Sequence, residues 1–203
     1  MIKSDACIIE KLKEYKALLE GHFILSSGRR SAQYVQFARI HEYPKAMKEF
    51  GDMLAQKISA QCKVLNLKID CIASPAIGAI VPGYQLASSL GVERYVFCER
   101  NKEGQFEFRR NFEIIAGQNY LIIEDVITTG GSFLEVAKLI EARGGKVVMV
   151  SSFIDRTNGK TFDYQFISLI SLEIPSYDAN ELPEFLKNIS PVKPGSRLIP
   201  VND

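Results

Sequence analysis

Short apolar runs alternate with helical segments over the middle of the chain, and this alternation restricts the fold more than any other feature. The runs are apolar on both faces, as strands buried in a parallel sheet are. We expect five strands, at residues 69–74, 94–99, 120–125, 146–155 and 164–172. The helical segments between them would supply the crossover connections that parallel strands need. The sequence therefore predicts an α/β fold with a five-stranded, mainly parallel sheet flanked by helices.

The residues before the sheet follow other patterns. Residues 5–20 have the spacing of an amphipathic helix, which Gly21 would end. Short strands are expected in "HFIL" and "QYVQFA", on either side of the turn "SSGRRS", and a second helix begins near Pro44. With 203 residues, no internal repeat and no long linker, the chain fits one domain.

Composition argues against several classes of function. The chain has 25 Lys and Arg against 24 Asp and Glu, so it lacks the strong positive field that gathers nucleic acid. Its four cysteines form no C-x-x-C pair, which disfavours a zinc site and suits a reducing compartment. No apolar run approaches the ~20 residues that span a bilayer, and the N-terminus lacks a signal-peptide core. We therefore expect a cytoplasmic protein that binds neither membrane nor nucleic acid.

The stretch "LIIEDVITTGGS" places two acids and a glycine-rich turn at the end of a predicted strand. In an open parallel sheet, ligands bind beyond the carboxyl ends of the strands, where Glu124 and Asp125 stand. The hydroxyls of Thr128, Thr129 and Ser132, the two glycines and the start of the next helix together make a phosphate cradle. A plain helix cap with a tight turn is the alternative, and the acidic pair directly upstream argues against it.

The absence of two common nucleotide-binding motifs narrows the class of ligand that this site would bind. The patterns G-x-x-x-x-G-K-[ST] and G-x-G-x-x-G are both missing, and no lysine stands ready to neutralise a triphosphate. Carboxylates beside a phosphate cradle suit ribose hydroxyls, or positive charge that grows on a sugar carbon. The residues therefore favour a ribose 5-phosphate with a leaving group at C1.

On these residues, "LIIEDVITTGGS" (121–132) resembles the phosphoribosyl-diphosphate signature of the type I phosphoribosyltransferases. Four further segments resemble the orotate phosphoribosyltransferase branch of that family, in the expected order: "FILSSGRRSAQYV" (23–35), "ASPAIGAIVPGYQLA" (73–87), "ERNKEGQFEFRRNF" (99–112) and "FIDR" (153–156). The resemblance implies the type I phosphoribosyltransferase fold. It implies Mg²⁺-dependent transfer of 5-phosphoribosyl from phosphoribosyl diphosphate to orotate, which gives orotidine 5′-monophosphate and diphosphate in pyrimidine biosynthesis.

The resemblance also implies a division of the single domain. An N-terminal helix and substrate-binding hood would occupy residues 1–43, the core residues 44–175 and a C-terminal segment residues 176–203.

Roles follow from the resemblance, position by position. Catalysis would fall to Glu124, Asp125 and Lys102, with the two acids facing the ribose hydroxyls and the developing cation. The residues implied to bind phosphoribosyl diphosphate are Arg100, Lys102, Glu124, Asp125, Val126, Ile127, Thr128, Thr129, Gly130, Gly131 and Ser132. Those implied to bind orotate are Thr128, Arg156, Ser27, Gly28 and Arg29. Mg²⁺ would arrive on the phosphoribosyl diphosphate, without a direct protein ligand, and the turn at 74–78 would lie near the diphosphate.

The polar and basic segment 99–112 looks like an exposed hairpin or the mobile loop of the family, which often reaches the partner subunit's site, so a homodimer is implied. Its cations are Arg100, Lys102, Arg109 and Arg110. The first two are the candidates to assist diphosphate departure, and a solvated charged hairpin is the alternative. The chain departs from the family at Ser26, where many members have lysine, at Ser74, and in a loop without histidine.

Other interpretations remain open on the residues alone. Arg156 would form a surface ion pair with Asp155 if it did not bind a ligand. A purine-base phosphoribosyltransferase has no ligand carboxylate for such an arginine to bind. A regulator that senses phosphoribosyl diphosphate and binds nucleic acid would need more positive charge or an appended helix-turn-helix.

Overall fold

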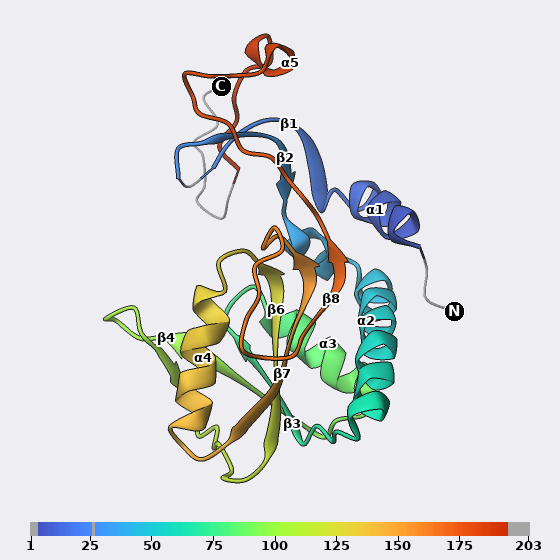
Figure 1. Ribbon diagram of the computed structural model, residues 1–203, viewed down its shortest axis with the longest axis vertical. Helices are drawn as coiled ribbons and strands as arrows, with labels where there is room; N and C mark the ends of the chain where they lie inside the picture. Colours follow the sequence, from blue (N-terminus) through green and yellow to red (C-terminus); the bar gives the residue numbers. More distant parts are fainter. Residues whose placement is uncertain (1–3, 26, 195–203) are drawn as a thin grey trace.

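Figure 1 shows the chain as a computed structural model, which describes residues 4–25 and 27–194. The helices are α1 (Asp5–Glu14), the 3₁₀ helix η1 (Phe37–Glu42), α2 (Pro44–Leu65), α3 (Ile80–Leu90), α4 (Gly131–Glu141) and α5 (Glu184–Lys187). The strands are β1 (Leu18–Ile24), β2 (Arg30–Val35), β3 (Cys71–Pro75), β4 (Arg94–Arg100), β5 (Phe106–Phe108), β6 (Asn119–Ile127), β7 (Lys146–Asp155) and β8 (Phe166–Ser171). The expectations that concern Ser26, residues 1–3 and residues 195–203 lie outside the described residues.

The central sheet has the strand order β5-β4-β3-β6-β7-β8. The five predicted strands are confirmed as β3, β4, β6, β7 and β8, and each pairs in parallel with its neighbours among them. A sixth strand, β5, was not predicted. It pairs antiparallel with β4 at the sheet edge, within the segment expected to be a hairpin or loop. β6, which carries the acidic pair, lies between β3 and β7 near the middle of the sheet.

Helices cover both faces of this sheet, as the apolar strands require. Ile72 and Leu121 pack into the core layer that contains α2 and α3. Ala73 and Ile122, the next residues along the same strands, pack into the layer that contains α4. Successive side chains of a strand point to opposite faces, so a strand buried on both faces has no polar alternation. Figure 1 shows α4 on one side of the sheet and α2 and α3 on the other.

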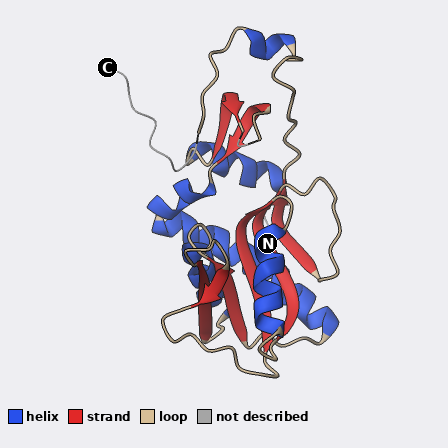
Figure 2. Cartoon of the chain, turned by 90° about the vertical axis from the view of Figure 1, so that its left-hand side faces the viewer, coloured by secondary structure: helices blue, strands red, loops and turns tan. Residues whose placement is uncertain are grey.

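A second, two-stranded sheet stands beside the first. β1 and β2 form an antiparallel hairpin that is not hydrogen-bonded to the six-stranded sheet. Figure 2 shows this hairpin above the larger sheet, with the C-terminal segment running alongside it. That segment is bridged to the hairpin through Val192, which pairs with Phe23, and Tyr177, which pairs with Arg30. We use the name hood, as above, for residues 1–43, and the C-terminal segment completes its hydrogen bonding.

The helix expected over residues 5–20 is wrong in its second half. α1 ends at Glu14, Lys16 turns the backbone with φ 55°, and Leu18 begins a strand that pairs with Val35. Pairing with β2 therefore outweighed the helical spacing of the apolar residues. Gly21 is not a helix end but lies where the β1–β2 register shifts, a common place for glycine in a strand.

The described residues include no helix that is both long enough and apolar enough to cross a membrane.

Candidate functional site

The carboxyl end of β6 opens into a cavity of about 230 Å³. β6 ends at Ile127, a three-residue turn follows, and α4 begins at Gly131. The lining residues are Arg100, Glu124, Glu135 and residues 126–133. The structure therefore brings together Arg100, Glu124 and the whole predicted phosphate loop. Helix N-terminal N–H groups and a tight turn at one cavity wall make a site for a phosphate group.

Glycine is required at position 130 for two reasons. Gly130 has φ 85°, a backbone conformation that side chains disfavour. A β-carbon there would also lie 2.7 Å from ring atoms of both Phe133 and Phe162. These two rings pack edge to face at 4.8 Å between their centres, directly behind the turn. The two rings therefore pack closely against the turn and support it, and Phe133 also lines the cavity.

Lys160 is a loop contact that the sequence did not reveal. Its ammonium group donates a hydrogen bond to the carbonyl oxygen of Thr129 at 2.8 Å. Thr129 also accepts a bond from the N–H of Gly131 through its hydroxyl at 3.4 Å. Lys160 lies in the stretch "TNGK", which carries no motif, so no signal in the sequence pointed to it.

The two acids of the motif point to different surroundings. Glu124 lines the cavity, whereas Asp125 faces the turn between β3 and α3. A β-carbon on Gly78 would lie 2.8 Å from Oδ2 of Asp125, so this turn can approach the acid only with glycine there. The N–H of Val126 donates to Oδ1 of Asp125 at 2.8 Å and fixes the carboxyl group.

Both carboxyl groups hold their protons more tightly than usual. Burial raises the pKa of Glu124 to about 8, the charge of Asp125 adds to the rise, and a hydrogen bond from Ser132 opposes it. Burial also raises the pKa of Asp125, against the hydrogen bond from Val126. Two adjacent buried carboxyls disfavour the doubly charged state. A ligand that brings hydroxyl donors or positive charge would stabilise their ionised form.

The turn from β3 to α3 lies beside Asp125. The N–H of Ala76 donates to the carbonyl of Cys98 at 2.7 Å, and the peptide bond between Ala76 and Ile77 is cis. Ser74, one of the departures from the family, shares a 2.7 Å hydrogen bond with the hydroxyl of Tyr95. That hydroxyl also donates to the carbonyl of Ile80 at 2.9 Å. Ser74 is therefore used to join β3, β4 and the start of α3.

Arg156 lies next to the phosphate loop. It follows the end of β7, and its N–H donates to the carbonyl of Ile127 at 2.8 Å. Burial lowers the pKa of its guanidinium, and the nearby Tyr34 of the hood opposes this. Its Nε is buried without a hydrogen-bond partner in the described chain. Asp155 instead accepts from the N–H of Thr157, and the described residues form no ion pair between Arg156 and Asp155.

The predicted residues Ser27, Gly28 and Arg29 lie in the hood turn and do not line the cavity. Gly28 has φ 83°, and its N–H donates to the carbonyl of Leu25 at 2.9 Å. The Arg29 side chain donates to the hydroxyl and carbonyl of Ser176, at 2.9 and 2.6 Å, so it ties the C-terminal segment to the hood.

The next residue, Arg30, is not among the site residues that the sequence predicted. Its Nε and Nη1 are buried and have no partner among the described residues. By the alternation of β2 it shares a face with Tyr34, the residue near Arg156.

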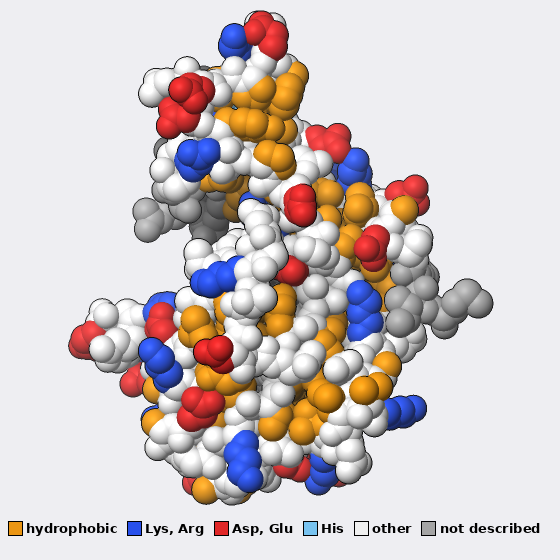
Figure 3. All heavy atoms as spheres, in the orientation of Figure 1, with side chains coloured by type: hydrophobic (Ala, Val, Ile, Leu, Met, Phe, Trp, Pro, Cys, Tyr) orange, Lys and Arg blue, Asp and Glu red, His pale blue; other side chains and the backbone are white. Residues whose placement is uncertain are grey.

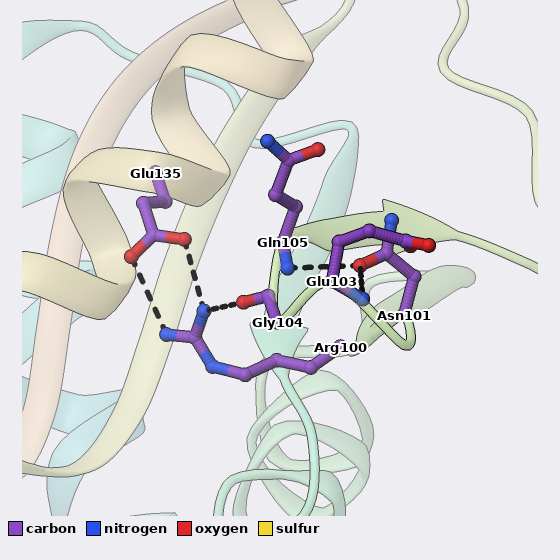
Figure 4. Close-up of polar contacts among 6 residues, drawn as sticks. All are labelled: Arg100, Asn101, Glu103, Gly104, Gln105 and Glu135. Atoms are coloured by element: carbon purple, nitrogen blue, oxygen red, sulfur yellow. Dashed lines mark hydrogen bonds and ion pairs between the residues drawn. The ribbon is translucent and has the colours of Figure 1, made fainter.

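The four cations of segment 99–112 have separate positions. Arg100 lines the cavity, whereas Lys102 lies in the exposed turn of the β4–β5 hairpin and has no ion pair in the described chain. Arg109 pairs with Glu107 at 3.3 Å and Arg110 with Glu99 at 2.9 Å, away from the cavity. Figure 4 shows the Arg100 side chain extended from the hairpin toward α4. Arg100 alone of these four reaches the cavity in this conformation.

No cluster of three or more His, Cys, Asp or Glu side chains suited to a metal ion occurs within residues 4–25 and 27–194. Glu124 and the hydroxyl-bearing loop present oxygen atoms at the cavity wall, which is the type of ligand atom that Mg²⁺ prefers.

Comparison with known proteins places the chain among relatives. Residues 36–183 match the family described as "Phosphoribosyl transferase domain". The chain is 39% identical over 191 residues to an orotate phosphoribosyltransferase of Caldanaerobacter subterraneus subsp. tengcongensis, covering 94% of this chain and 96% of that one. It is 41% identical over 194 residues to an orotate phosphoribosyltransferase of Methylorubrum populi, covering 95% and 96%.

Solved structures agree on the fold. Orotate phosphoribosyltransferase from Aeropyrum pernix superposes with a TM-score of 0.68 at 22% identity, covering 82% of this chain and 94% of that one. Adenine phosphoribosyltransferase from Thermoanaerobacter pseudethanolicus superposes with a TM-score of 0.63 at 23% identity, covering 79% and 99%. Proteins named for a pyrimidine and for a purine base thus share this fold, so the fold by itself does not select the base.

Proposed function

The chain belongs to the phosphoribosyltransferase family, and from this premise we propose that it transfers 5-phosphoribosyl from phosphoribosyl diphosphate to orotate. The products are orotidine 5′-monophosphate and diphosphate, and the reaction belongs to pyrimidine nucleotide synthesis. The observation that carries this function is the cavity beyond β6, where a phosphate loop, a buried acid and Arg100 meet. The purine-base alternative has less support, because the relatives at about 40% identity carry the orotate name over nearly the whole chain.

The phosphate loop binds the 5-phosphate of the ribose. Residues 128–132 and the N-terminus of α4 line the cavity, where backbone N–H groups and the helix dipole favour an anion. The hydroxyls of Thr128, Thr129 and Ser132 add donors to it. Lys160 holds the loop by its bond to Thr129 and adds positive charge nearby.

Glu124 and Asp125 act on the ribose. Displacement at C1 builds positive charge on the sugar ring, and a carboxylate placed beforehand stabilises that charge. Glu124 lines the cavity directly, and Asp125 lies against the β3–α3 turn on the far side. Hydrogen bonds from the ribose hydroxyls favour the ionised acids, against the burial that raises their pKa values in the free protein.

The diphosphate leaves toward Arg100. A guanidinium donates paired hydrogen bonds to phosphate oxygens, and Arg100 already lies at the cavity wall. Lys102 is the second cation, carried on the turn of the same hairpin. Mg²⁺ neutralises the diphosphate when it is bound. The residues of this chain hold the sugar, orient the leaving group and exclude water from C1.

Orotate binds between the hood and the core. Its carboxylate and planar ring suit the guanidinium of Arg156, whose buried Nε lacks a protein partner. Thr128 contacts the base from the core side, and the backbone of residues 27–29 lines it from the hood. Tyr34 acts to raise the pKa of Arg156 against the effect of burial, so a side chain of the hood lies near this arginine of the core.

A spectrophotometric assay tests the proposal. Orotate absorbance should fall only when phosphoribosyl diphosphate and Mg²⁺ are both present, and chelation of the metal should stop it. The same protein should leave adenine, hypoxanthine and xanthine unchanged. Turnover of a purine base without turnover of orotate would refute the assignment.

Arg156→Ala tests the base site. Removing a charged donor that faces a carboxylate should weaken orotate binding by about tenfold or more, because hydrogen bonds to charged groups contribute about 1.5–3 kcal/mol. Phosphoribosyl diphosphate should bind almost as before. Calorimetric titration of each ligand measures both affinities. Equal losses for the two ligands would contradict the role of Arg156, and Arg143→Ala, which changes an exposed arginine just beyond the end of α4, is the matched control.

A homodimer completes the proposed function. Ile77, Val81 and Tyr84 are 86%, 43% and 69% exposed, and their spacing puts them on one side of α3 and the turn before it. Such an unpaired apolar stripe suits contact with a second copy. The β4–β5 hairpin would lie at the edge of that contact, where it can reach the neighbouring site. A cytoplasmic location is also proposed, and four free thiols support it.

A further inference from the structure

The Arg100 side chain is held from three directions. Its Nη1 and Nη2 lie 3.1 and 3.3 Å from the two carboxylate oxygens of Glu135. Nη1 also donates to the carbonyl of Gly104. The ring of Phe106 packs beneath the guanidinium, with its centre 3.9 Å from the central carbon. Figure 4 shows Arg100 between the hairpin turn and α4.

The turn that presents Gly104 is itself fixed. The side-chain oxygen of Asn101 accepts the N–H groups of Glu103 and Gln105 at 3.1 and 2.9 Å. The N–H of Asn101 donates to the carbonyl of Gln105 at 2.8 Å, and that of Gly104 donates to the carbonyl of Asn101 at 3.0 Å. Gly104 has φ 81°, which suits glycine in such a turn. The carbonyl that accepts from Arg100 is therefore held by a closed set of local bonds.

Glu135 is placed on α4, one turn beyond the phosphate loop. It lines the same cavity as Arg100, so the ion pair forms part of the cavity wall. The positive charge of Arg100 offsets the carboxylate of Glu135, which would otherwise repel a phosphate ligand. The two side chains are 45% and 47% exposed, and ion pairs this exposed add little to the stability of a fold. The ion pair can therefore serve to orient Arg100, although it adds little to the stability of the fold.

We propose that Glu135 is a positioning residue, which holds Arg100 at the cavity wall in the geometry that receives the diphosphate. This inference rests on the proposed function for the identity of the ligand. A long side chain fixed in advance loses less conformational freedom when the ligand binds. Arg100 has two Nη groups and an Nε, so it can donate to the diphosphate while one edge stays on Glu135.

Competition between Glu135 and the ligand for Arg100 would change the affinity for phosphoribosyl diphosphate in the opposite direction. If Glu135 withheld Arg100 from the ligand, its removal would tighten binding of phosphoribosyl diphosphate. The sign of the change therefore decides between positioning and competition.

Three variants make the test. Glu135→Ala removes the pair, and Glu135→Gln keeps one oxygen acceptor without the charge. Glu141→Ala is the matched control, since Glu141 lies on the same helix, accepts from the hydroxyl of Tyr164 and does not line the cavity. Thermal unfolding of each variant checks that the fold is retained.

The expected result is specific to one ligand. Glu135→Ala should raise KM for phosphoribosyl diphosphate and Kd for Mg²⁺-diphosphate by about two- to tenfold, the factor for ordering one long side chain. KM for orotate should be unchanged and kcat should stay within about twofold. Glu135→Gln should fall between wild type and Glu135→Ala, and Glu141→Ala should match wild type.

A double variant tests the route of the effect. If Glu135 acts through Arg100, adding Glu135→Ala to Arg100→Ala should cause no further loss of diphosphate affinity. Additive losses would overturn the proposal, as would tighter binding in Glu135→Ala or an equal loss in Glu141→Ala.

Diphosphate binding separates this inference from the proposed function. The titration uses no orotate, so a wild-type protein that fails to convert orotate still reports whether Glu135 affects Arg100. Failure of orotate turnover refutes the base assignment alone. Failure of wild-type protein to bind Mg²⁺-diphosphate refutes the positioning role.

Discussion

At the scale of the residue, the two adjacent acids have different surroundings because a strand turns successive side chains to opposite sides. Glu124 faces the cavity and Asp125 faces the glycine turn at position 78. Burial raises the pKa of both, and that of Glu124 reaches about 8. The free site therefore stores an unfavourable arrangement that a ribose with two hydroxyl donors would relieve.

This arrangement predicts a pH-dependent cost to stability. The pKa of Glu124 in the folded protein, about 8, lies above its usual 4.5, so the folded protein keeps a proton that the unfolded chain releases. The free energy of unfolding should therefore fall as the pH rises from about 4.5 to about 8. Glu124→Gln removes this slope. Its Tm should exceed that of wild type at pH 9 by at least roughly 2 °C, the shift for about 1 kcal/mol in a domain of this size.

Thermal unfolding at pH 5, 7 and 9 measures this difference. The advantage of Glu124→Gln should be smallest at pH 5, where the acid is protonated in the folded protein. Glu141→Gln, an exposed change on α4, serves as the control. Parallel pH profiles for wild type and Glu124→Gln would show that burial of the acid has no such cost.

The local sequence predicted the glycine turn before α4, but it did not predict the residues that support this turn. Gly130 and the hydroxyl residues beside it indicate a turn before a helix, because few residue types fit that backbone conformation. Lys160 and Glu135 carry no such signal, since their roles depend on partners that are distant in sequence or on another element. The Arg29 side chain binds Ser176, which only the fold brings near, so nothing in the sequence indicated this contact.

At the scale of the element, the charged segment folds into the β4–β5 hairpin, whose turn holds the side chain of Arg100. The apolar strands were predictable because their pattern is long and has two buried faces. β5 spans three residues in a polar stretch, too short for any period to mark it. The end of α1 was missed for a related reason, since apolar residues that fit a helix also serve β1 once β2 is present.

Asn101→Ala should loosen this hairpin. The change removes the acceptor for the N–H groups of Glu103 and Gln105, so their amide hydrogens should exchange at least about tenfold faster. Hydrogen-exchange NMR measures those two amides. Lys102→Ala lies in the same turn and should leave them unchanged. Unaltered exchange in Asn101→Ala would show that the backbone alone holds the turn.

At the scale of the whole molecule, two groups of apolar side chains remain exposed, and such groups suit contact with another protein surface. One group is the stripe on α3 proposed as the dimer contact. Another lies on the C-terminal segment, where Phe185 is 59% exposed, and Figure 3 shows hydrophobic side chains gathered on this upper part of the molecule. The sequence shows neither group, because exposure is decided by the packing of all elements together.

Tyr84→Asp should separate the dimer. A charge buried in an apolar contact is strongly disfavoured, so the dissociation constant should rise by at least about tenfold. Sedimentation velocity over a range of protein concentrations measures it. Phe185→Asp places the same charge on the other exposed group and should leave the assembly intact. A monomeric wild-type protein, or a Tyr84→Asp protein that still forms dimers, would contradict the proposed contact.

The two strands of the hood are bridged to residues near the other end of the described chain. β1 pairs with Val192 and β2 with Tyr177, while the six-stranded sheet is complete at Ser171. A ribosome delivers the chain from its N-terminus, so β1 and β2 are synthesised well before their C-terminal partners. After Val35, which ends β2, 157 more residues are synthesised up to Val192, the last partner of the hairpin. The six-stranded sheet and the turn before α4 are therefore synthesised in full before the hood can complete its hydrogen bonds.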